Sequence, residues 1–103
     1  MGLIAATVTK QYLIAYKNEL EYKMILIKQA KFGLSDSVNE LLNVGTDMDP
    51  ENPMVKQLEQ RKERLNLLEK KLDMQLDEYE TKLKLVETGL KECDQMISSS
   101  IKG

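Results

Sequence analysis

The sequence predicts an all-α fold: an antiparallel helical hairpin of two long helices, coiled-coil-like, assembling with other copies of the chain. Apolar residues recur every three or four positions over long stretches, which is the spacing of helices that pack lengthwise on one another. The chain of 103 residues has 31% charged and 5% aromatic residues, with only two prolines and five glycines. We therefore expect one domain over residues 1–103, with a helix at 3–44, a turn at 45–52 and a helix at 53–101.

The C-terminal helix is predicted from a regular apolar stripe. After one gap of seven, every gap in the stripe is three or four residues, through Leu58, Leu65, Leu68, Leu72, Leu76, Tyr79, Leu83, Val86, Leu90, Cys93, Ile97 and Ile101. Two consecutive gaps of four, around Leu72, predict a stutter that locally unwinds a supercoil. Because Cys93 falls on this stripe, it is expected to be buried as a packing residue.

The N-terminal helix is apolar around more of its circumference. One stripe is expected to run through Tyr12, Tyr16, Leu20, Met24, Ile27, Phe32 and Leu34, and a second face holds Leu13, Ile14, Ile25 and Leu26. One partner helix covers only one side, so the other face is expected to pack against a further helix.

Gly33 leaves the course of this helix open. The helix either breaks there and restarts with Ser37 and Glu40 as a capping box, or continues through the glycine at a cost of about 1 kcal/mol.

Proline and asparagine define the turn. Pro50 keeps the preceding residue extended, Asn52 is suited to cap the second helix, and Pro53 is suited to its first position. A short connection of this kind between long helices predicts an antiparallel hairpin.

The residue inventory argues against an enzyme. Histidine is absent and each glycine is isolated, so conventional triads, histidine metal sites and glycine-rich phosphate loops are not expected. Asp47 fails as the start of a calcium loop, because Asn52 and Leu58 stand where glycine and glutamate are needed. We therefore predict no catalytic, cofactor-binding or metal-binding residues and no cofactor.

Charge and hydropathy limit the partners. The net charge is −2, made up of +3 over residues 1–34, −5 over 35–53 and balanced charge beyond. Interspersed charge of both signs does not favour nucleic acid binding. No apolar run is long enough to span a membrane, and the N-terminus lacks the features of a cleaved signal peptide. Contact with a membrane surface remains open, since the first helix is basic and apolar.

Two segments carry a resemblance to a known family. The turn Pro50-Glu-Asn-Pro53 has the P-x-x-P form, and the chain ends in Leu90-Lys-Glu-Cys-Asp-Gln-Met-Ile-Ser-Ser-Ser-Ile101. Both segments resemble the needle subunits of bacterial type III secretion systems, in which such a turn joins two helices. The resemblance implies a hairpin that polymerises, with its C-terminal helix towards a channel.

These observations predict a non-enzymatic structural subunit that self-assembles through its helices into a filament or other homo-oligomer. The location expected is extracellular or at the cell surface, without a cleaved signal peptide. The alternative is a cytoplasmic coiled-coil adaptor or secretion chaperone that binds another helical protein. The expected interface residues are Leu13, Leu26, Ile14, Ile25, Tyr12, Tyr16, Leu83, Leu90, Ile97 and Ile101.

Overall fold

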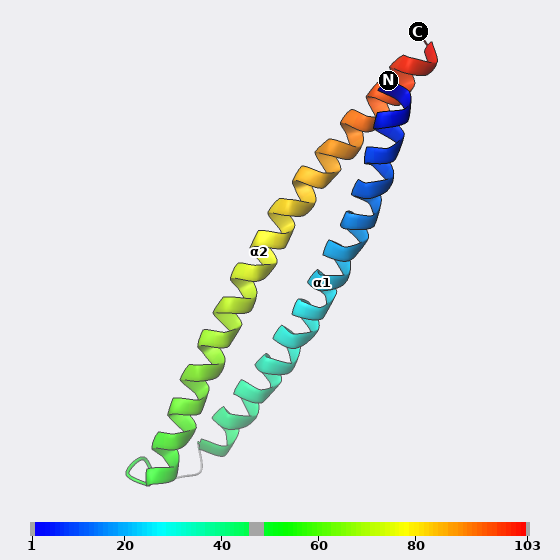
Figure 1. Cartoon of the computed structure of the whole chain (residues 1–103). Coiled ribbons are helices and arrows are strands. Elements are labelled where there is room, and N and C mark those ends of the chain that lie inside the picture. The colour runs from blue at the N-terminus through cyan, green and yellow to red at the C-terminus, as the bar shows by residue number, and fades with distance from the viewer. Residues whose placement is uncertain (1, 46–48, 103) are drawn as a thin grey trace. The chain divides into compact units, whose positions relative to one another are not determined.

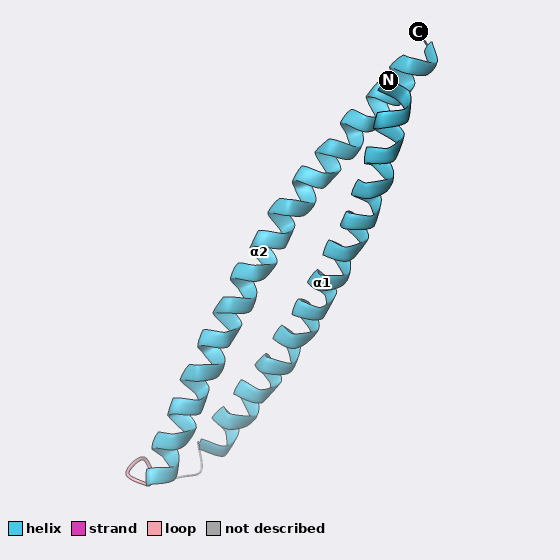
Figure 2. Cartoon of the chain, viewed as in Figure 1, coloured by secondary structure: helices cyan, strands magenta, loops and turns pink. Residues whose placement is uncertain are grey.

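The chain is an all-α helical hairpin, which confirms the predicted fold class. The computed structural model describes residues 2–45 and 49–102. Helix α1 spans Gly2–Gly45 and helix α2 spans Pro53–Lys102, each end within one residue of the sequence expectation (Figure 1). Figure 2 shows helix and loop, and no strand, in these residues.

Asn52 and Pro53 take the places in the turn that the sequence predicts. The Asn52 backbone N–H donates to the Asp49 carbonyl at 2.9 Å, which closes a β-turn with Pro50 in its second position. The Asn52 side-chain oxygen then accepts from the Met54 N–H at 3.0 Å, so Asn52 caps α2. Pro53 is the first residue of the helix, where its missing N–H costs nothing. Thr46, Asp47 and Met48 lie outside the described residues.

Helix α1 continues through Gly33, so of the two alternatives the unbroken helix is correct. The Ser37 hydroxyl donates to the Gly33 carbonyl at 3.0 Å, four residues back along the same helix. The hydroxyl is therefore engaged within the helix instead of starting a new one with Glu40. A Cβ on Gly33 would meet nothing within 4 Å, so close packing does not require a glycine there.

Two compact units divide the chain: Met1–Ile25 with Asp77–Gly103 form unit 1, and Leu26–Leu76 forms unit 2. In unit 1 the start of α1 packs along the end of α2 (Figure 1). Buried and half-buried positions recur there every three or four residues on both helices. These positions, the seam of unit 1, are Ala6, Lys10, Leu13, Lys17, Leu20 and Met24 on α1, and Tyr79, Leu83, Val86, Leu90, Cys93 and Ile97 on α2.

Unit 2 has the same spacing but a thinner core. Its seam positions are Ile27, Lys31, Leu34, Val38 and Leu41 on α1, and Val55, Leu58, Lys62, Leu65, Glu69, Leu72 and Leu76 on α2. Among the described residues, unit 2 has one buried apolar residue, Ile27, whereas unit 1 has five: Ala6, Leu20, Met24, Val86 and Cys93. Lysine and glutamate at seam positions bury less apolar area than leucine or isoleucine would, so the two helices are held together less strongly there.

The predicted stutter in α2 is wrong. Glu69, not Leu68, occupies the half-buried position between Leu65 and Leu72, while Leu68 is exposed. The gaps of three and four therefore alternate without interruption. The apolar pattern favours Leu68 over Glu69 for this position. Glu69 can nevertheless occupy it, because the stem of a glutamate can lie along a seam while its carboxylate reaches water.

The predicted stripe on α1 also needs correction. Leu20, Met24, Ile27 and Leu34 are buried or half-buried on the seam, but Tyr12 and Phe32 are exposed. Leu13 was assigned to the second face and instead lies on the seam. Lysines occupy seam positions that the apolar pattern could not reveal.

Two ion pairs between the helices set the register. Lys10 pairs with Asp94 in unit 1, with Nζ 2.6 Å from Oδ1. Lys31 pairs with Asp73 in unit 2. Lys31 follows Lys10 by 21 residues, and Asp73 precedes Asp94 by 21 residues. The antiparallel register is therefore the same in each unit. Each pair is partly exposed, so it contributes at most about 1 kcal/mol and mainly selects this alignment.

Candidate interaction surface

The most distinctive surface of unit 1 is the side of α1 turned away from α2. We name as the outer stripe the exposed residues Ile4, Val8, Gln11, Tyr12, Ala15, Asn18, Glu19, Tyr22 and Ile25. Tyr12 is 68% exposed, Tyr22 62% and Ile4 76%. Only Glu19 in the outer stripe carries a charge. A helix of a monomeric protein normally turns charged residues to this side.

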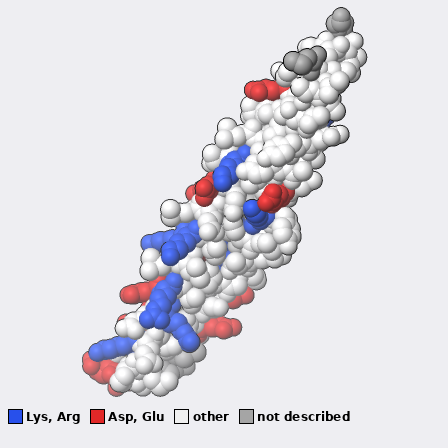
Figure 3. Space-filling view, viewed as in Figure 1, with Lys and Arg blue, Asp and Glu red and all other residues white. Residues whose placement is uncertain are grey.

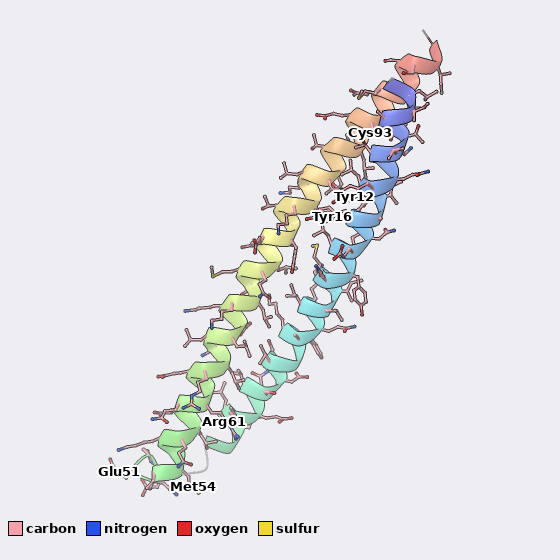
Figure 4. The ribbon with its side chains drawn as sticks, viewed as in Figure 1. Tyr12, Tyr16, Glu51, Met54, Arg61 and Cys93 are labelled. Atoms are coloured by element: carbon pink, nitrogen blue, oxygen red, sulfur yellow. The ribbon has the colours of Figure 1, made fainter. Side chains whose placement is uncertain are left out.

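Tyrosine rings contribute much of the stripe's area. The Tyr12 and Tyr16 rings stack with centroids 6.4 Å apart and planes 6° apart. Figure 4 shows both side chains on the N-terminal part of α1. Tyr16 is half-buried at the edge of the seam, which leaves Tyr12 as the exposed member of the pair. A rigid, exposed aromatic ring is a typical anchor of a protein interface.

Helix α2 presents the opposite character in unit 1. Most of its exposed positions are polar or charged, among them Asp77, Glu78, Thr81, Lys84, Thr88, Lys91, Glu92 and Gln95. The exposed apolar residues there are Leu85, Met96 and Ile101. Figure 3 shows side chains of both signs interspersed on the face in view. In unit 1 the exposed side of α1 is therefore more apolar than the exposed side of α2, which is mainly hydrophilic.

A small electrostatic cluster lies beside the outer stripe. Glu19 accepts a hydrogen bond from the Lys23 ammonium at 3.0 Å, and the Glu19 carboxylate raises the pKa of Lys23 above its usual 10.5. The ammonium groups of Lys23 and Lys82 lie 5.9 and 5.7 Å from the centre of the Tyr79 ring. The single charge of the stripe thus has a partner on its own helix.

The residues predicted as interface fall into two groups. Leu13, Tyr16, Leu83, Leu90 and Ile97 are half-buried between the two helices of unit 1. Tyr12, Ile14, Ile25, Leu26 and Ile101 are exposed. Val8 and Tyr22 also belong to the exposed apolar set and were not predicted, although their helical spacing from Tyr12 and Ile25 was a usable signal.

Cys93 is buried, as predicted (Figure 4). It lines a narrow groove of about 240 Å³ in unit 1 with Ala5, Ala6, Thr9, Leu13, Gly89, Glu92 and Met96. Gly89 allows close approach here, since a Cβ on it would lie 3.0 Å from the Leu13 Cδ1. The absence of a side chain at Gly89 therefore leaves room for Leu13 beside this groove.

The described residues contain neither a candidate metal cluster nor a candidate membrane span. No group of three or more histidine, cysteine, aspartate or glutamate side chains is arranged to hold a metal ion there. Neither α1 nor α2 contains a window apolar enough to cross a lipid bilayer.

Comparisons with known proteins do not place the chain in a family. No family model matches its sequence, and neither a curated protein nor a solved structure is significantly similar to it.

Proposed function

We propose that this chain is a non-enzymatic structural subunit that self-assembles through its helices into a homo-oligomer or filament. The observation that carries the proposal is the outer stripe: nine exposed positions on one side of α1 with a single charge. Its place opposite the seam means that the hairpin's own helices do not cover it.

The apolar area agrees with a protein interface. The large side chains of the stripe, Ile4, Val8, Tyr12, Tyr22 and Ile25, each leave on the order of 100 Å² open, about 500 Å² together. One partner in a standard interface buries about 800 Å², of which somewhat more than half is apolar, about 450 Å². The stripe therefore supplies the apolar part of one complete interface.

The likeness of the turn and the C-terminal run to type III secretion needle subunits supports the filament form of the assembly and an extracellular place for it. A helical-hairpin coiled coil with a mainly hydrophilic α2 side in unit 1 suits such a role, since that side stays in water while the outer stripe makes contacts. The competing role, an adaptor that binds another protein's helix, would use the same stripe for a different protein.

Light scattering and negative-stain microscopy of the purified full chain test the proposal. We expect a mass of at least two chains and regular particles or filaments. The variant Val8→Lys with Tyr22→Lys should abolish assembly, while Thr81→Lys with Thr88→Lys, which adds the same charge to the exposed side of α2, should not. A wild-type chain that stays monomeric at all concentrations would contradict the proposal and favour the adaptor.

A further inference from the structure

The two helices of unit 2 expose charges of opposite sign. On α1, the exposed residues of the range 32–43 include two carboxylates, Asp36 and Glu40, and no cation. We name these residues the acidic surface. On α2, the exposed residues of the range 53–75 have a net charge of +3, and we name them the basic surface. Its cations are Lys56, Arg61, Arg64, Lys70 and Lys71, and its carboxylates are Glu59 and Glu63.

The charges of these surfaces are not used within the hairpin. Asp36, Glu40, Arg64 and Lys71 take part in none of the ion pairs found among the described residues. In unit 1, by contrast, the exposed Glu19 carboxylate pairs with a lysine of its own helix. Exposed charges without a partner remain available to a second molecule.

Apolar side chains accompany the charges on both surfaces. Phe32, one helical turn before Asp36, is 72% exposed. Leu67 is 59% exposed and lies between Arg64 and Lys71 along α2. Each surface therefore combines one predominant sign of charge with apolar area, and this combination is typical of surfaces that bind proteins.

We propose that the acidic surface of one copy of the chain binds the basic surface of the next copy. A second copy is the occupant because the chain itself supplies both members of a complementary pair. The proposal rests on self-assembly through the outer stripe, as proposed above, and adds a second contact of a different kind. A contact between unlike surfaces leaves one surface of each sign unoccupied at the two ends of an assembly. Copies are therefore added until a ring closes, or without limit in a filament.

The contact in unit 2 depends on the outer stripe. Exposed ion pairs are individually weak and are screened by salt. Copies that the outer stripe joins present several acidic and basic surfaces together, so the weak contacts act in concert. A chain without the outer stripe is therefore a monomer, and a chain without the unit 2 contact forms only the small species that the stripe holds together.

Two charge variants of the full chain test the contact, with particle mass followed by light scattering. The first variant is Asp36→Lys with Glu40→Gln, where position 40 is left neutral because Glu40 shares a groove with Arg61. The second variant is Arg64→Glu with Lys71→Glu. Neither variant alone should grow beyond small species. Mixed together, they should grow, because the intact basic surface of the first meets the intact acidic surface of the second.

A control variant and a salt series accompany this test. Lys84→Glu with Lys91→Glu makes the same change of charge as the second variant on the exposed part of α2 in unit 1, and it should grow like the wild type. Growth of the wild type should also decline between about 0.1 and 1 M salt, where the screening length falls from about 10 to about 3 Å. The salt series needs no substitution, so it tests the contact even if a variant loses its helical circular dichroism.

Each remaining outcome overturns a stated proposal. Variants that grow alone like the wild type, a mixture that stays small, a control variant that stops growing, or wild-type growth that is equal at both salt concentrations overturns the unit 2 contact. Any of these results leaves self-assembly through the outer stripe standing. A wild-type chain that remains a monomer overturns both proposals.

Discussion

Leu20 and Ile25 are five residues apart on α1 and should respond differently to the same substitution. Leu20 is 2% exposed on the seam of unit 1, and Ile25 is 53% exposed on the outer stripe. Replacing either with lysine removes an aliphatic side chain and adds one positive charge, with little change in helix propensity. Only the burial of the position differs.

The structure gives the magnitude of the difference. Leu20→Lys loses the transfer free energy of a buried leucine, about 1.5–3 kcal/mol, and adds the cost of bringing an ammonium to the seam. We expect a free energy of unfolding about 3 kcal/mol lower, which for a domain of this size lowers Tm by about 12–24 °C. Ile25→Lys loses about half of the transfer term at most, about 1 kcal/mol.

Thermal melting followed by circular dichroism at 222 nm, repeated over a dilution series, measures both effects. Dilution is needed because self-association stabilises the folded chain and raises its apparent Tm. Ile25→Lys should remove the concentration dependence and lower Tm at the dilute limit by about 4–8 °C at most, whereas Leu20→Lys should lower Tm by about 12–24 °C at every concentration. Equal losses for both variants at the dilute limit would refute the assignment of the two faces.

Three more outcomes follow from the fold. Gly33→Ala should raise the free energy of unfolding by about 0.5–1 kcal/mol, because alanine favours the helix and its Cβ would meet nothing there. Gly89→Ala should raise it less, because the new Cβ would crowd Leu13. Urea denaturation compares the two variants, and a larger gain at Gly89 would contradict the packing described. Hydrogen exchange should show the amides of unit 2 opening before those of unit 1, because unit 2 has the thinner core; uniform protection would count against this. Replacing both Pro50 and Pro53 with alanine should let helix propagate through the turn and exchange helices between chains; an unchanged mass by light scattering would speak against that.

The sequence was sufficient for the two helices and the turn because their signals are local. Asn52 and Pro53 have the chemistry of a cap and of a first helical position, and both take those places. Apolar residues at gaps of three and four predicted most of the α2 seam, and the burial of Cys93 followed from its place in that spacing.

The sequence predictions are wrong at positions where the polarity of a residue does not match its burial. Lys10, Lys17, Lys31, Lys62 and Glu69 occupy half-buried seam positions, and a pattern built on apolar residues skips them. Their long stems can cover apolar surface while the charged ends reach water or a partner.

The outer stripe was also not predicted correctly, because some of its large apolar residues are exposed and not buried against α2. Tyr12 and Phe32 were assigned to the seam because they are large and apolar, yet the alternating gaps of the seam exclude both. On a helix that is apolar on two sides, only the position of the partner helix tells which side it covers. The division of α1 into a seam and an outer stripe therefore required the structure.

Sedimentation velocity of the full chain over a wide concentration range tests the central claim most directly. The wild-type chain should sediment as an associated species that dissociates on dilution, and Val8→Lys with Tyr22→Lys should sediment as a helical monomer throughout. A wild-type chain that remains a monomer, or a charged variant that associates as strongly as the wild type, would contradict the claim that the outer stripe joins copies of this chain.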